Sequence, residues 1–167
     1  MILPAVDVSD YQGEIAWDQA LDHVNAVVVQ VGYATKYGEA STKTGARNIA
    51  STRGRTLVGA YFFGYPVIGP YAAIQGQRAA DMAMTAGWRP ASDLPLALDI
   101  EVNPMAMEPA AMSDWIDAWL QGTGIDPKHL AGLITGAARL GANGGLKGGR
   151  AVTQVPSGEG VCRGVDW

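Results

Sequence analysis

The chain is poor in the residues that build disulfides and metal sites. It has a single cysteine, Cys162, among 167 residues, and one cysteine cannot form an internal disulfide. Its only histidines, His23 and His129, do not lie near other ligands at a spacing typical of metal sites. A chain of this length can bury enough surface to fold without such supports. We therefore expect no metal and no cofactor, and nothing points to an oxidising compartment.

Long apolar runs and basic stripes are lacking as well. No segment approaches the length of a membrane span, and Met1 leads directly into the first expected strand without a basic leader. We therefore expect neither a membrane span nor a signal peptide. The net charge is −4, with acids and bases scattered along the chain, which argues against a nucleic-acid partner.

Phosphate-binding loops are also missing. No Gly-x-Gly-x-x-Gly follows a strand and opens a helix, and no Walker-type loop occurs. The glycine-rich tract at residues 141–149 lacks that context, so we interpret it as a loop that replaces lost structure. Ser9 lies beside acids, but no Gly-x-Ser-x-Gly elbow surrounds it, and its hydroxyl is expected to hold a turn.

What the chain does contain is an alternation of apolar, β-branched segments with amphipathic ones. Strands are predicted at residues 3–6, 25–31, 57–63, 94–98 and 130–136, and helices at residues 17–23, 44–52, 71–87 and 109–120. Strands separated by helices pair in parallel through right-handed crossovers. The prediction is an α/β fold in one domain, residues 1–167: an irregular TIM-like (β/α) barrel, leaving open whether its last strands are complete. A doubly wound open sheet is the main rival.

Acidic residues end several of these strands. Residues 94–101 read Leu-Pro-Leu-Ala-Leu-Asp-Ile-Glu, and because side chains alternate along a strand, Asp99 and Glu101 share one face. Asp7 follows the first strand and Asp166 lies near the end of the chain. In a parallel barrel such residues converge at the carboxyl ends of the strands. Paired carboxylates there suit general acid/base chemistry, although a solvated turn is the alternative for Asp99 and Glu101.

Four segments together resemble one family. Residues 7–17 contain Asp-Val-Ser-Asp-Tyr-Gln-Gly and then Ile-Ala-Trp, residues 59–63 read Gly-Ala-Tyr-Phe-Phe, residues 94–101 end in Leu-Asp-Ile-Glu, and residues 164–166 read Gly-Val-Asp. They resemble the motifs Asp-x-Ser-x-x-Gln-Gly, Gly-x-Tyr-His-Phe, Leu-Asp-x-Glu and Gly-x-x-Asp of the glycoside hydrolase family 25 lysozymes. A phenylalanine replaces the histidine of the second motif. The resemblance is good up to Glu101 and poor afterwards, where the chain is shorter than the family's.

The resemblance implies a muramidase that cleaves the β-1,4 bond between N-acetylmuramic acid and N-acetylglucosamine in peptidoglycan. Glu101 would be the general acid, and Asp99 would stay ionised and stabilise the oxocarbenium-like charge or assist the substrate's N-acetyl group. Asp7 and Asp166 would orient the sugar or water. The expected place of action is the bacterial cell wall, reached through phage lysis or as part of a virion.

Aromatic side chains divide into two groups. Trp17, Trp88, Trp115 and Trp119 have helical or helix-end positions and are expected in the core, whereas Tyr33, Tyr61 and Tyr65 lie at or beyond strand ends and are candidates for binding substrate. Gln12, part of the first motif, is a further candidate by resemblance.

Other functions remain open from the sequence. Residues 130–136 lack the family's tyrosine, and its late Trp-Gln-Tyr strand survives only as residues 152–155. No Trp-x-Ala-x-Tyr segment or wall-binding module is visible. These gaps motivate a second hypothesis, a non-catalytic barrel that serves as a structural or glycan-binding part of a phage virion or surface assembly, with other virion proteins as partners. A barrel acting on another amino sugar polymer is a third.

Overall fold

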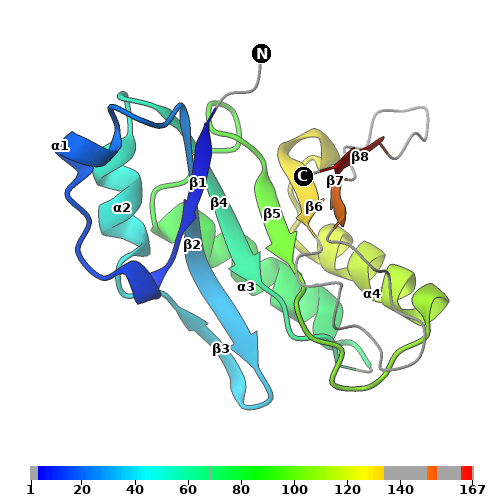
Figure 1. The fold of residues 1–167 in the computed structure, drawn as a ribbon. Helices are drawn as coiled ribbons and strands as arrows, with labels where there is room; N and C mark the ends of the chain where they lie inside the picture. Colours follow the sequence, from blue (N-terminus) through cyan, green and yellow to red (C-terminus); the bar gives the residue numbers. More distant parts are fainter. Residues whose placement is uncertain (1–3, 68, 134–149, 154–162, 167) are drawn as a thin grey trace.

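A computed structural model describes residues 4–67, 69–133, 150–153 and 163–166. The strands are β1 (Ala5–Val8), β2 (Ala26–Thr35), β3 (Gly38–Ser41), β4 (Leu57–Phe63), β5 (Leu96–Asp99), β6 (Leu130–Leu133), β7 (Arg150–Thr153) and β8 (Arg163–Asp166). The helices are α1 (Trp17–Ala20), α2 (Gly45–Thr52), α3 (Tyr71–Thr85) and α4 (Pro109–Gly122), with short 3-10 turns η1 (Asp10–Gln12) and η2 (Pro127–His129). The predicted alternation of strands and helices is confirmed (Figure 1).

The central sheet is mostly parallel. Its order is β1-β2-β4-β5-β6, every neighbouring pair runs parallel, and β3 adds an antiparallel strand beside β2. β7 and β8 form a separate antiparallel pair. Within the described residues β1 and β6 form the edges of the main sheet, so this part of the chain does not show a closed barrel.

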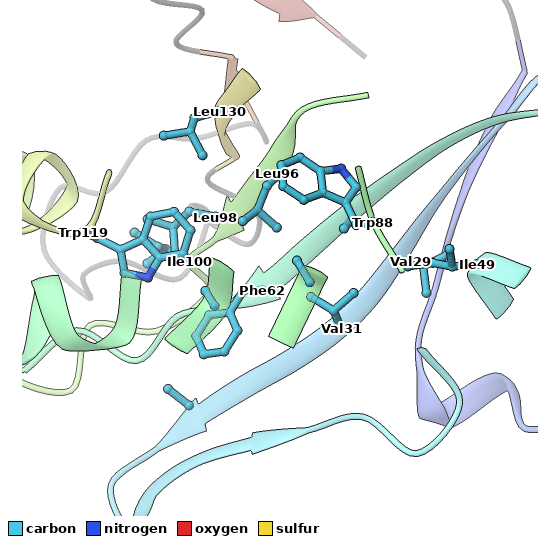
Figure 2. Close-up of a cluster of buried hydrophobic side chains, with 14 of the residues drawn as sticks. Val29, Val31, Ile49, Phe62, Trp88, Leu96, Leu98, Ile100, Trp119 and Leu130 are labelled. Atoms are coloured by element: carbon cyan, nitrogen blue, oxygen red, sulfur yellow. The ribbon is translucent and has the colours of Figure 1, made fainter. Parts of the chain in front are cut away.

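The helices pack on one face of the sheet. Alternate strand residues, including Val29, Phe62 and Leu98, are at most 1% exposed and share one core cluster with helix residues such as Ile49 and Trp119 (Figure 2). The rings of Phe62 and Trp119 lie 6.3 Å apart. All four α-helices contribute to this cluster, which is the arrangement of a barrel wall rather than of a doubly wound sheet. The four tryptophans predicted for the core are buried, as expected.

Two glycines allow α3 and α4 to approach closely. A Cβ at Gly76 would lie 2.0 Å from the carbonyl oxygen of Trp119, and a Cβ at Gly122 would lie 2.2 Å from that of Ala73. Backbone therefore meets backbone at this crossing, and no larger residue fits either position without a shift. In the described part of the chain, no helix is long and apolar enough to cross a membrane.

The segment before β5 is fixed by an ion pair. Arg53, just after α2, donates to both carboxylate oxygens of Asp93 at 2.9 and 2.8 Å and to the carbonyl oxygen of Gly87 at 2.6 Å. Asp93 also accepts from the backbone N–H of Arg89 at 2.8 Å. These bonds tie α2 to the connection that leads into the acidic strand.

Candidate active site

The face of the main sheet opposite the helices carries two of the predicted acids, Asp7 and Asp99, and Glu101 follows the end of β5. Paired residues of parallel strands point to the same side, and the register pairs Phe63 with Asp99 and Tyr61 with Ala97. Tyr61 and Asp99 therefore lie on one face, away from Phe62 and the core. Asp7 pairs with Val28 of β2, and Val28 pairs with Gly59 of β4. Gly59 and Tyr61 are alternate residues of β4, so Asp7 lies on the same face as Tyr61.

Tyr61 is influenced by three of the predicted acids. Burial, with the side chain 9% exposed, raises the pKa of its phenol, and the negative charges of Asp7, Asp99 and Glu101 raise it further. A hydrogen bond with the Ser9 side chain opposes this change without cancelling it. Three carboxylates, from β1 and from the end of β5, are thus near enough to Tyr61 of β4 for their charges to act on its phenol.

Asp99 and Glu101 differ in exposure. Asp99 is 6% exposed, and its backbone carbonyl accepts a 2.7 Å hydrogen bond from the N–H of Gly64. Ile100 turns into the core and is 1% exposed, while Glu101 is exposed to solvent. The predicted alternation is confirmed, and Asp99 is not part of a solvated turn. The pair offers one enclosed and one accessible carboxyl group, both engaged with neighbouring groups.

Ser9 and Gln12 shape the turn after β1. The Gln12 side-chain oxygen accepts hydrogen bonds from the backbone N–H and the hydroxyl of Ser9, at 2.7 and 2.9 Å, and Ser9 in turn accepts from the N–H of Tyr11. The expectation that Ser9 holds this turn is confirmed. Gln12 lies five residues after Asp7, and its oxygen supports the turn that follows β1.

The two other predicted tyrosines differ in surroundings. Tyr33 pairs in register with Phe63, so it lies on the face of Asp99, and it is 37% exposed. Tyr65 packs partly against the core, and its backbone N–H and carbonyl are held by the Gln75 side chain at 3.3 and 2.9 Å. Tyr33 is therefore the better placed of the two for contact with a ligand on the acidic face.

Sequence reasoning missed the role of Asp10. Its carboxylate accepts from the backbone N–H groups of Lys43 and Thr44 at 3.0 and 2.9 Å and from the Thr44 hydroxyl at 2.7 Å. Although burial raises the pKa of Asp10, these hydrogen bonds outweigh it and hold the pKa below its ordinary value. The bonds fix the loop after β1 to the start of α2. They join residues more than thirty positions apart in sequence, so no local pattern could have revealed them.

Some expectations fall outside the described residues. The backbone of Asp166 ends β8, opposite Arg150 of β7, but its side chain is not described. The glycine-rich tract at 141–149, residues 154–155 and Cys162 also lie outside. Within the described part of the chain, no three His, Cys, Asp or Glu residues are grouped so that they could hold a metal ion.

Comparisons with known proteins give a consistent result. The model of the family described as "Glycosyl hydrolases family 25" matches residues 6–129. A muramidase from Acremonium alcalophilum is similar in structure, with TM-score 0.62 and 23% identity over 80% of this chain and 66% of that chain. A family 25 glycosyl hydrolase from Bacillus anthracis gives TM-score 0.56 and 18% identity over 80% of this chain and 61% of that one.

A third similar structure is the catalytic domain of endolysin ply40 from bacteriophage P40 of Listeria monocytogenes, with TM-score 0.62 and 14% identity over 81% of this chain and 63% of that one. No curated protein matches. The chain thus spans no more than 66% of these three relatives. At these identities the likeness concerns the fold, and it confirms the predicted α/β, TIM-like class.

Proposed function

Because the chain belongs to the glycosyl hydrolases of family 25, we propose that it is a muramidase, which cleaves the β-1,4 bond between N-acetylmuramic acid and N-acetylglucosamine in peptidoglycan. The single observation that carries the proposal is the environment of Tyr61. The charges of Asp7, Asp99 and Glu101 all raise the pKa of its phenol, which supports a site made of acids from separate strands. Most glycoside hydrolases act through an oxocarbenium-like transition state and use two carboxyl groups beside the cleaved bond.

The roles of the acids follow from the resemblance and are supported by their exposure. Glu101 is the general acid that protonates the leaving oxygen, since an exposed group can reach a polymeric substrate. Asp99 stays ionised and stabilises the positive charge or assists the N-acetyl group of the substrate. Its burial suits this role, because a charge acts more strongly where water is excluded. Asp7 and Asp166 orient the sugar or the water.

The substrate would lie along the acidic face. Tyr61 and Tyr33 share this face with Asp99, so their rings or hydroxyl groups can contact sugars next to the cleaved bond. Tyr65 and Gln12 complete the proposed binding residues at the ends of β4 and β1. The place of action would be the bacterial cell wall. A similar structure is a phage endolysin, which fits a route through phage lysis; incorporation into a virion is the other route.

The family match favours hydrolysis over the non-catalytic hypothesis, and digestion of purified peptidoglycan tests it. Wild type should release fragments with new N-acetylmuramic acid reducing ends, identified by mass spectrometry. Glu101→Gln keeps the shape of the side chain and removes its proton, so we expect a loss of at least about a hundredfold in rate. Glu108→Gln is the matched control, because Glu108 is also exposed and precedes α4 without capping it through its side chain.

Circular dichroism of each variant checks that the fold is kept. Full activity of Glu101→Gln, or equal loss in Glu108→Gln, would contradict the assignment of the acid. No release by folded wild-type protein from several types of wall would reject the proposed function and return the non-catalytic hypothesis.

A further inference from the structure

The β2–β3 hairpin projects beyond the strands that surround it. The last residue of β4 in register with β2 is Phe63, which pairs with Tyr33, whereas Ala34 and Thr35 pair only with β3. In Figure 1 the hairpin extends away from the sheet, past the carboxyl ends of β4 and β5. It therefore stands at the edge of the sheet where the acids lie.

The tip of the hairpin carries hydrogen bonds of the Thr35 side chain. The Thr35 hydroxyl donates to the carbonyl oxygen of Gly38 at 3.1 Å and accepts from the N–H of Tyr37 at 3.1 Å. Gly38 has φ +126°, which an L-residue rarely adopts. Glu39 forms an ion pair with Arg78, so α3 braces the hairpin from the helix side of the sheet.

The tip presents an aromatic ring to solvent. Tyr37 is 87% exposed, so its ring contributes little to the stability of the fold. The Nζ atom of Lys36 lies 4.8 Å from the ring centroid and covers one side of it. The high exposure leaves the other side open to a flat, partly apolar partner. Tyr33 lies between this tip and the acids along β2, on the same face of the sheet as Asp99, and is 37% exposed. It offers a second aromatic side chain for contact with the same polymer.

The distance from the acids suits sugars beyond the cleaved bond. Thr35 lies two residues past the row that contains Tyr33, Phe63 and Asp99, which is roughly 7 Å along the strand, and β2 is two strands away from β5, about 10 Å across the sheet. This separation of the backbones assigns Tyr37 to a sugar beside those at the cleaved bond rather than to the reacting atoms. Tyr37 is near enough to meet a polymer that passes over the acidic face.

We infer that the β2–β3 hairpin is a binding arm for the polymeric substrate, in which Tyr37 stacks on a sugar ring remote from the cleaved bond. Lys36 pairs with a carboxylate carried by the same polymer. The inference rests on the proposed function, because that function supplies the polymer. Its consequence is a preference for long glycan chains over short ones that occupy only the acidic face.

The test compares kcat/KM on soluble, uncross-linked peptidoglycan strands and on a fragment of two disaccharide units. In Tyr37→Ala the ratio of long-chain to short-chain kcat/KM should fall about five- to tenfold, through a higher KM, because one stacking contact is lost. Tyr37→Trp should restore the ratio, and Lys36→Ala should lower it less. The control is Leu57→Ala, since Leu57 is 50% exposed at the opposite end of β4 and should not change the ratio.

The outcomes separate the arm from the proposed function. If wild type hydrolyses both substrates and Tyr37→Ala leaves the ratio of long-chain to short-chain kcat/KM unchanged, the hairpin is not a binding arm, although the proposed function stands. If wild type hydrolyses neither substrate, the proposed function fails, and co-sedimentation with insoluble peptidoglycan decides the arm by itself. A smaller fraction of Tyr37→Ala than of wild type bound to the peptidoglycan, restored in Tyr37→Trp, then supports the binding arm. Equal bound fractions of wild type and Tyr37→Ala overturn it.

Discussion

Replacing Arg53 by alanine should weaken the fold strongly, although Arg53 is far from the acidic face. Its guanidinium donates two hydrogen bonds to Asp93 and one to the carbonyl oxygen of Gly87. The Asp93 side chain is only 6% exposed, and that of Arg53 is 24% exposed. Arg53→Ala therefore leaves a buried carboxylate with the backbone N–H of Arg89 and the hydroxyl of Ser92 as its remaining donors.

The magnitude follows from the loss of one partner of a buried pair. Such a loss typically costs about 3–5 kcal/mol, because the remaining charge is neither hydrated nor neutralised. The donors left to Asp93 and the partial exposure of Arg53 place the expected cost near the lower end, about 3 kcal/mol in the free energy of unfolding. A domain of this size is typically stable by about 5–15 kcal/mol, so the loss is readily measured.

Urea unfolding followed by circular dichroism gives the free energy of unfolding for each variant. Arg55→Ala is the matched control, because Arg55 pairs with Asp18 through side chains that are 44% and 94% exposed, and its loss should cost less than about 1 kcal/mol. The double variant Arg53→Ala/Asp93→Ala should cost less than the two single changes added together. A cost for Arg53→Ala no larger than that of the control, or simple additivity in the double variant, would refute the reasoning.

Three further predictions concern other parts of the molecule. Because folding lowers the pKa of Asp10, its carboxylate stabilises the fold above the ordinary value of 3.8, and this contribution is lost as the pH falls through the lowered pKa. The destabilisation by Asp10→Asn, measured by urea unfolding, should therefore shrink below about pH 4. A destabilisation that does not change with pH would contradict this prediction. Gly76→Ala should destabilise the protein by about 1–3 kcal/mol, because the added methyl group meets the carbonyl oxygen of Trp119. This loss should outweigh the higher helix propensity of alanine. A rise in the melting temperature would show that α3 and α4 leave room for the methyl group. Burial and then the charges of the neighbouring carboxylates raise the pKa of Tyr61. In an ultraviolet titration, the tyrosine ionisation that is present in wild type and missing in Tyr61→Phe should therefore occur well above about pH 10, where tyrosine ordinarily ionises. If it occurs near the ordinary pH, the support for carboxylates near Tyr61 is lost.

Much of the fold could be predicted because its signals are local. Apolar, β-branched runs such as residues 26–31 and 57–63 indicate buried strands, and the four helices begin and end close to their expected residues. Alternation along a strand also predicted that Asp99 and Glu101 face away from Ile100, and Ile100 does lie in the core. These predictions depend only on the periods of strands and helices.

The β2–β3 hairpin was not predicted. The sequence indicated a strand that stops at Val31, whereas β2 continues to Thr35 and returns as β3. Residues 38–41 are too few and too polar to suggest a strand by themselves. They become one because β2 offers a free edge beyond Ser9 and β1, and because Arg78 of a later helix holds Glu39 in place. Gly38 was the one local signal of a turn.

The sequence by itself determined the order of strands and helices, the alternation that places acids and core residues on opposite faces, and the motifs of the family. Only the tertiary structure decided which acids act on Tyr61, how deeply Asp99 is buried compared with Glu101, and which long-range pairs, such as Arg53 with Asp93, join distant segments. The physical reason is range. Backbone periodicity acts over a few residues, whereas burial and charge act between residues that are close in space and far apart in the chain.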